Sequence, residues 1–324
     1  MSRCARESQH RVSGRFQVTA SRAPAPSLPD GRSWPTIQGM SRKPLGLAAL
    51  GLCALALGCT VETVDDSAQA QAGSTHALIS IARQTSAATP DDTRADAFAG
   101  FLRAPAGVDA ASALRGAGLG VELPGLGECR KASTGDGAVA LTRVELLEAG
   151  EVTLAAGGNV TTLALRAFPT VTDSISGVVY TTRDRASTPL PAASAYTFAT
   201  TGSSSLGPLS GDAPAPAALS GVLLAGEPLG DVEGIPAGED LKLAWDPGSA
   251  GDRIYVELDQ NAATTVCAFD DATGEGSIPS SLLPVSGEAS LAVHRLRQTA
   301  FTDDGLAHGE LRFDFELSAS VSFE

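Results

Sequence analysis

Residues 311–324 read LRFDFELSASVSFE, and this stretch decides the fold class. Its apolar side chains, at every odd-numbered position, alternate strictly with polar ones. Because successive side chains of a β-strand point to opposite faces, the pattern predicts one long strand with a buried apolar face and a solvated polar face.

Shorter segments of the same kind precede this strand. Leucines and Trp245 share one face of residues 241–245, and residues 253–258 place Ile254, Val256 and Leu258 together. Further strands separated by Gly, Pro and Asp turns are predicted at 144–146, 151–154, 161–165, 176–181 and 195–199. One helix is predicted over 108–119, although three glycines weaken it. The predicted fold is all-β, with antiparallel β-sandwiches.

Composition divides the exported part of the chain into three regions. Residues 59–97 are rich in Ala, Ser, Thr, Asp and Gln and predict a lipid anchor followed by a flexible tether, although residues 77–81 could instead form a first strand. A Pro/Ala/Gly stretch at 211–216 predicts a boundary between an N-terminal β domain, 98–210, and a C-terminal β-sandwich domain, 211–324.

The C-terminal region resembles fibronectin type III and other immunoglobulin-like sandwiches. The resemblance rests on Leu241-x-Leu243-x-Trp245-x-Pro247 and the strand that follows, and it covers roughly residues 213–260. It implies a β-sandwich. Residues 266–269 and 278–279 depart from the fibronectin pattern, so the strand order stays open.

The start of the chain predicts export. Residues 40–43 form a short basic region, and residues 44–58 form an apolar stretch of signal-peptide length that is shorter than the roughly 20 residues of a membrane span. Translation is expected to begin at Met40, so that residues 1–39 are untranslated or belong to a misassigned start. A transit peptide is the competing interpretation of this Arg-rich segment.

The apolar stretch ends in Leu55-Ala56-Leu57-Gly58-Cys59, which resembles the lipobox of bacterial lipoproteins. The resemblance implies that residues 40–58 are a signal peptide and that Cys59 is the lipidated, palmitate-bearing N-terminus of the mature chain. Cys53 fits less well because the bulky Leu52 precedes it. Composition and layout also resemble lipoproteins of GC-rich soil bacteria such as myxobacteria, and that resemblance implies no known activity.

Charge excludes nucleic acid as a partner. Residues 1–58 hold eight of the 23 basic and two of the 37 acidic residues, so residues 59–324 carry 15 basic and 35 acidic residues and a net charge of −20. Such a surface repels phosphates and anionic headgroups. The expected membrane contact is therefore the lipid anchor.

Two cysteines, Cys129 and Cys267, follow Cys59. In an oxidising envelope compartment they could form a disulfide, or they could remain two buried free thiols. Their spacing to the histidines matches no zinc motif, and we expect no metal and no cofactor.

The three histidines after Cys59 form no recognisable catalytic motif. His76 falls in the predicted tether, His294 is expected to face solvent, and His308 lies in a turn-like segment. Two aspartate pairs beside glycines, Asp270-Asp271 and Asp303-Asp304, are weak calcium candidates, although Asp-Gly runs more often form turns.

These features favour a lipid-anchored envelope protein that is not an enzyme. It would bind an envelope protein or a glycan, or support a surface assembly. The alternative is a secreted hydrolase, or the accessory domain of one, that uses loop carboxylates. By resemblance to enteric sorting rules, Thr60 favours the outer over the inner membrane.

Overall fold

The computed structural model describes residues 73–132, 144–167, 175–182, 195–261 and 263–324. The described residues are mostly β-strands, with the single short helix α1 (Ala110–Gly116) and the 3-10 turns η1 (Asp271–Thr273) and η2 (Ser280–Leu282). The predicted all-β, largely antiparallel fold is confirmed. No helix in the described part is both long and apolar enough to cross a membrane.

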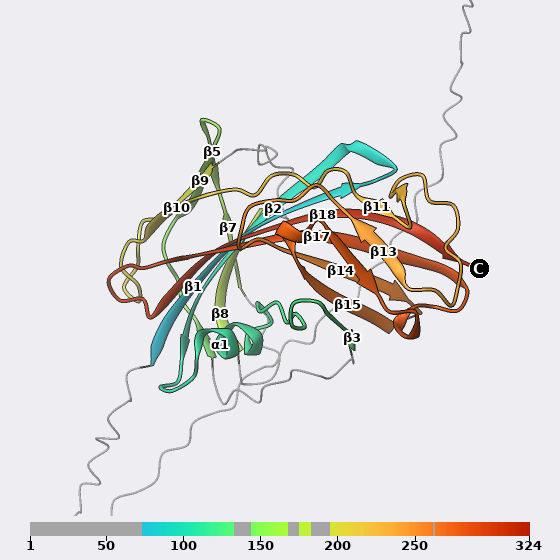
Figure 1. Cartoon of the computed structure of the whole chain (residues 1–324). Coiled ribbons are helices and arrows are strands. Elements are labelled where there is room, and N and C mark those ends of the chain that lie inside the picture. The colour runs from blue at the N-terminus through green and yellow to red at the C-terminus, as the bar shows by residue number, and fades with distance from the viewer. Residues whose placement is uncertain (1–72, 133–143, 168–174, 183–194, 262) are drawn as a thin grey trace, which may run out of the picture. The chain divides into compact units, whose positions relative to one another are not determined.

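The largest sheet has ten strands (Figure 1). Neighbours in it are antiparallel except for the parallel pairs β1–β18 and β4–β8. In spatial order the strands are β3 (Glu128–Ala132), β15 (Ala263–Asp270), β14 (Arg253–Gln260), β17 (Gly287–Phe301), β18 (His308–Phe323), β1 (Ser74–Ser86), β2 (Thr89–Ala104), β4 (Val144–Leu146), β8 (Ile175–Thr181) and β7 (Ala164–Ala167).

Two four-stranded sheets pack on the large one. The first has the order β10 (Ser210–Pro214), β9 (Ala195–Thr200), β5 (Val152–Ala156) and β6 (Asn159–Thr162). The second has the order β12 (Glu227–Pro228), β11 (Leu223–Leu224), β13 (Leu241–Ala244) and β16 (Glu275–Ile278).

The strand β18 contributes to two hydrophobic cores. Phe313 and Phe315 pack into the core beneath the first small sheet, and Val321 and Phe323 pack into the core beneath the second. All four residues are odd-numbered and therefore lie on one face of the strand. Both small sheets consequently cover the same face of the ten-stranded sheet, at its two ends. In Figure 1 the first small sheet, with β5, β9 and β10, lies at the left of the view, and the second, with β11 and β13, lies at the right.

The opposite face carries α1 and a third core. Leu114 of the helix packs with Leu78, Leu102 and Val144. The Asp109 side chain caps the helix by accepting a hydrogen bond from the Ser112 amide at 2.9 Å.

Glycines let the chain turn back beneath α1. Gly118 has a positive φ of 71°, which favours glycine over other residues. The Gly120 amide then donates to the Leu114 carbonyl at 3.0 Å. A Cβ at Gly120 would lie 2.9 Å from the Arg115 backbone, so only glycine allows this close approach.

The polar face of β18 is not fully solvated, contrary to the prediction. Glu310 and Arg312 are buried. They pair with each other at 2.6 Å, and an Nη1 group of Arg312 donates to the Leu119 carbonyl at 2.9 Å. The chain after α1 thus covers this part of the strand, and the ion pair offsets the cost of burying both charges.

Two predicted boundaries also differ from the structure. The stretch 211–216 contains most of β10, which pairs with β9, so it is not a linker between separate domains. Residues 74–97 of the predicted tether form β1 and part of β2, in agreement with the alternative strand at 77–81. The described residues belong to one compact unit, and residues 1–72, including Cys53 and Cys59, lie outside the described residues.

Candidate functional site

Three of the four calcium candidates, Asp270, Asp271 and Asp303, use their carboxylates for other contacts. Asp271 is fully buried and forms an ion pair with Arg295 at 2.7 Å. The Asp270 side chain caps η1 by accepting from the Ala272 amide at 3.1 Å. Asp303 lies with Asp304 in the β17–β18 connection and accepts from the Asp304 amide at 2.7 Å. Within the described ranges no three His, Cys, Asp or Glu side chains converge as metal ligands.

Two arginines of β17 hold the connection between β10 and β11 against the large sheet. Arg295 pairs with Asp271, and Arg297 pairs with Asp252 at 2.6 Å. Both guanidinium groups also donate to backbone carbonyls of residues 214–218, which lead from β10 towards β11. These buried charges are therefore used to hold a connecting segment in place.

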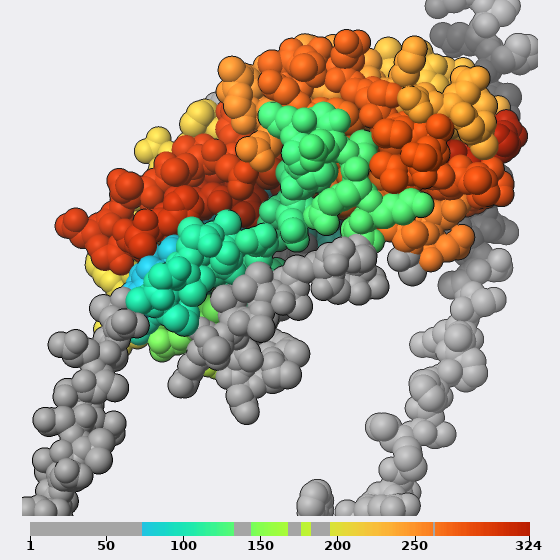
Figure 2. Space-filling view, turned by 60° about the horizontal axis from the view of Figure 1, so that its bottom comes forward, coloured from blue at the N-terminus to red at the C-terminus, as the bar shows by residue number. Residues whose placement is uncertain are grey.

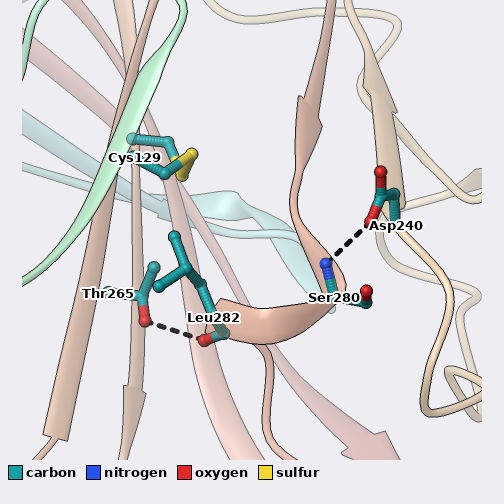
Figure 3. The surroundings of a disulfide bond; sticks show 6 residues. Cys129, Asp240, Thr265, Ser280 and Leu282 are labelled. Carbon is teal, nitrogen blue, oxygen red and sulfur yellow. Dashed lines mark hydrogen bonds between the residues drawn. A yellow bond between two sulfur atoms is a disulfide. The ribbon is translucent and has the colours of Figure 1, made fainter.

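The two cysteines that remain after Cys59 are joined in the structure. Cys129 of β3 lies opposite Cys267 of β15 in the strand register, with an S–S distance of 2.04 Å. Figure 3 shows the disulfide beside Thr265, whose hydroxyl donates to the Leu282 carbonyl at 3.0 Å. The bond ties the end of the segment that follows α1 to the edge of the large sheet.

His294 is buried, with an exposed fraction of 6%, contrary to the prediction that it faces solvent. Its ring stacks on Tyr255 at a centroid distance of 4.1 Å, and Nδ1 lies 2.9 Å from Asp314 Oδ1. The Tyr255 hydroxyl donates to the other oxygen of Asp314 at 2.6 Å. The strand alternation placed His294 on the polar face correctly, but it gave no sign that this part of the face is covered.

Electrostatics in this cluster favour a protonated imidazole. Burial lowers the pKa of His294, but the hydrogen bond and the charge of Asp314 outweigh it, so that the pKa is raised. Burial also raises the pKa of Glu257 on the neighbouring β14. Nε2 of His294 has no hydrogen-bond partner among the described residues, so no nucleophilic hydroxyl is seen there to complete a catalytic triad.

The other two histidines lie near one edge of α1. His76 is buried in β1, where its Nε2 is 2.8 Å from the Ser74 hydroxyl. Burial and then the charge of His308 lower the pKa of His76. His308 begins β18, and its Nε2 lies 4.0 Å from Glu310.

An open groove lies where residues 218–230, in and around the second small sheet, meet β1, β2 and β18 of the large sheet, and we call it the interlobe groove. It has a volume of about 370 Å³ and is lined by Arg83, Phe315, Leu317, Leu219 and Leu229 among others. The Arg83 guanidinium lies over the Phe315 ring, 4.7 Å from its centroid. The groove is largely apolar, with its one arginine already stacked on an aromatic ring.

A second hollow lies on the opposite face, and we call it the α1 cavity. It has a volume of about 400 Å³ and lies between α1, residues 120–123 and the strands β14, β17 and β18. Figure 2 shows the segment after α1, in green, crossing the orange and red strands that form the floor. The lining includes Arg115, Arg253 and Arg312.

Sequence reasoning identified neither hollow. The α1 cavity combines residues about 200 positions apart, such as Arg115 and Arg312, and no local motif marks such a set. The one available signal is the unusual run of charges at 310, 312, 314 and 316 in an otherwise serine-rich polar face.

Comparisons with known proteins add only weak structural similarity. A scan of protein families and a search of curated proteins found no match for this chain. The FN1-FN3 domains of chicken CNTN1 are similar at a TM-score of 0.20 and 14% identity, covering 60% of this chain and 64% of that structure, which is less than two thirds of its length.

Two further structures are similar at 10% identity. The Danio rerio Fcho1 Mu homology domain with bound Eps15 peptide has a TM-score of 0.24 and covers 79% of this chain and 99% of that one. Tandem Ig domains of titin have a TM-score of 0.12, with coverage of 59% and 90%. These values carry no argument about function.

Proposed function

We propose that this protein is a lipid-anchored binding module of the bacterial cell envelope. The observation that carries the proposal is the apolar stretch of signal-peptide length that ends in the lipobox-like Leu55–Cys59. A diacylglyceryl group plus an N-acyl chain on Cys59 would hold the protein at a membrane stably, because each buried methylene contributes roughly 0.8 kcal/mol. Thr60 favours the outer membrane.

The described part of the chain supports binding rather than catalysis. Its buried or half-buried ion pairs, Arg295–Asp271, Arg297–Asp252 and Arg312–Glu310, include arginines that donate to backbone carbonyls and hold those segments in place. Its two hollows, the interlobe groove and the α1 cavity, have volumes within the range of small-molecule sites. We therefore propose a non-enzymatic role for the module, with an envelope protein or glycan as its partner.

A secreted hydrolase using loop carboxylates is the alternative. It requires an acid of raised pKa in a cleft. Among the described acids, Glu257 has such a pKa, but it lies on the strand β14 and lines neither of the two hollows. This observation does not favour the alternative over a binding module.

The intact mass of the protein, extracted with detergent from membranes of its source organism, tests the anchor. We expect the mass of residues 59–324 plus a diacylglyceryl and an acyl group. A Cys59→Ser variant should lose the lipid and stay unprocessed, whereas the matched Cys53→Ser variant should be lipidated normally. An unlipidated mass for the unaltered chain, or lipidation that depends on Cys53, would contradict the proposal.

A further inference from the structure

The α1 cavity gathers positive charge in a strongly acidic chain. Residues 59–324 contain only 15 basic residues against 35 acidic ones. Three of the basic residues, Arg115, Arg253 and Arg312, line this single cavity. The local charge is thus opposite to that of the chain as a whole, and a low-dielectric wall strengthens its attraction for an anion.

Two of these arginines already have partners. Arg312 pairs with Glu310 at 2.6 Å and donates to the Leu119 carbonyl. Arg115 donates to the Ser112 hydroxyl at 3.2 Å and lies 3.9 Å from Glu122. Both are therefore held as parts of the cavity wall.

Arg253 is different. No described carboxylate lies within ion-pair distance of its guanidinium, although it lines the same cavity and is exposed to solvent. It comes from β14, and the strand register places it between Leu296 of β17 and Asp270 of β15. The Asp270 carboxylate caps η1 by accepting from the Ala272 amide, and no ion pair joins it to Arg253. Its planar group is free to make the two parallel hydrogen bonds that a carboxylate accepts.

The rest of the lining selects the kind of anion. The three arginines and the two glutamates Glu122 and Glu310 together carry one net positive charge. A single carboxylate would neutralise it, whereas a multiply charged anion would meet the two glutamates. Much of the remaining wall is apolar and includes Leu114, Val121, Leu123 and Leu296.

We propose that the α1 cavity binds a small organic monocarboxylate with an apolar body, whose carboxylate pairs with Arg253. The inference goes beyond the proposed function, because it adds a small-molecule ligand to a module whose proposed partner is an envelope protein or glycan. The interlobe groove has no comparable feature, since its Arg83 is already stacked on Phe315.

The test measures binding of N-acetylleucine to the full mature chain in detergent by ligand-observed NMR titration. Its neutral isostere N-acetylleucinamide is the ligand control. Arg253→Gln is the cavity variant, and Arg94→Gln, an exposed arginine of β2 that does not line the cavity, is the matched control. Unfolding midpoints of both variants, compared with that of the unaltered chain, show whether each is folded.

We expect saturable binding of the acid, weakened about tenfold by Arg253→Gln and by the amide, and unchanged by Arg94→Gln. The proposal is overturned if the acid does not saturate, if the amide binds equally well, or if folded Arg253→Gln binds like the unaltered chain. The intact mass of the same sample reports lipidation separately. A missing lipid would contradict the proposed membrane anchor but would not affect the conclusion about ligand binding in the α1 cavity.

Discussion

The two halves of β18 share one apolar face but differ on the other. In residues 310–315 the polar positions are Glu310, Arg312 and Asp314, and Glu310 and Arg312 are buried beneath the segment that follows α1. In residues 316–323 most polar positions are serines, and Ser320 is exposed. The same alternating pattern therefore occurs in a half of β18 whose polar face is covered and in a half whose polar face is open. In this strand the covered half has charged residues that form an ion pair, and the open half has serines.

The covered half depends on the segment from α1 to β3, which the disulfide ties to the sheet. Replacing both cysteines, Cys129→Ala with Cys267→Ala, should lower the free energy of unfolding by about 4 to 5 kcal/mol, because the bond closes a loop of 138 residues. Urea denaturation of the unreduced protein measures this. A loss below about 1 kcal/mol would show that the bond does little to hold the segment.

Truncating a buried side chain on the apolar face of the covered half should strongly lower the free energy of unfolding. Phe313 is fully buried in the first core, so Phe313→Ala should cost about 3 to 5 kcal/mol in urea denaturation. Ser320→Ala, in the open half, should change the free energy of unfolding by less than about 0.5 kcal/mol. Equal effects of the two substitutions would remove the distinction between the halves.

The charge pair of the covered half offers a sharper test. Arg312→Ala leaves the Glu310 carboxylate buried without its partner and should destabilise by about 3 kcal/mol. The double variant with Arg312→Met and Glu310→Met should recover most of this loss, because methionines fill similar space without burying charge. If the double variant is less stable than Arg312→Ala, the Arg312–Glu310 pair stabilises the fold beyond the mutual neutralisation of its two buried charges.

The smallest expected effect is a pH dependence from His294. Asp314 raises the pKa of His294 in the folded state above its ordinary value of 6.5, so the protonated ring stabilises the fold. This contribution is complete below about pH 6.5 and is lost as the pH rises through the folded-state pKa.

His294→Phe keeps a ring to stack on Tyr255 but removes the titration. Its free energy of unfolding should therefore fall less between pH 6 and pH 8 than that of the unaltered chain. Ser320→Ala should keep the unaltered pH dependence. An unchanged slope in His294→Phe would assign the pH dependence to another group.

Local patterns predicted several strands well because turns and alternation are local. The predicted strand at 161–165 was wrong, because the chain leaves one sheet at Leu163 and divides this stretch between β6 and β7. The predicted strand at 144–146 is β4, and that at 195–199 is β9 within one residue. The tether prediction differed from the structure because the first core accepts small residues such as Ala77 and Ala97, which lie in a polar, Ala-rich stretch of the sequence that resembles a linker.

Local sequence patterns could not predict which parts of a strand's polar face are covered by other segments. The burial of His294 and Arg312 depends on contacts with residues far away in the chain, such as Tyr255 and Leu119. The α1 cavity likewise exists only once such segments meet. Periodicity assigns a side chain to a face, but only tertiary packing decides whether that face is open.

Because β18 contributes side chains to both cores, we expect the two cores to unfold as one unit, and Trp245 allows a direct test. It is the only tryptophan after residue 58 and is buried in the second core, whereas Phe313 lies in the first. In urea, Phe313→Ala should lower the midpoint of the Trp245 fluorescence transition as much as that of the circular-dichroism transition. A Trp245 midpoint unchanged from the unaltered chain would show that the second core folds without the first and would contradict the account.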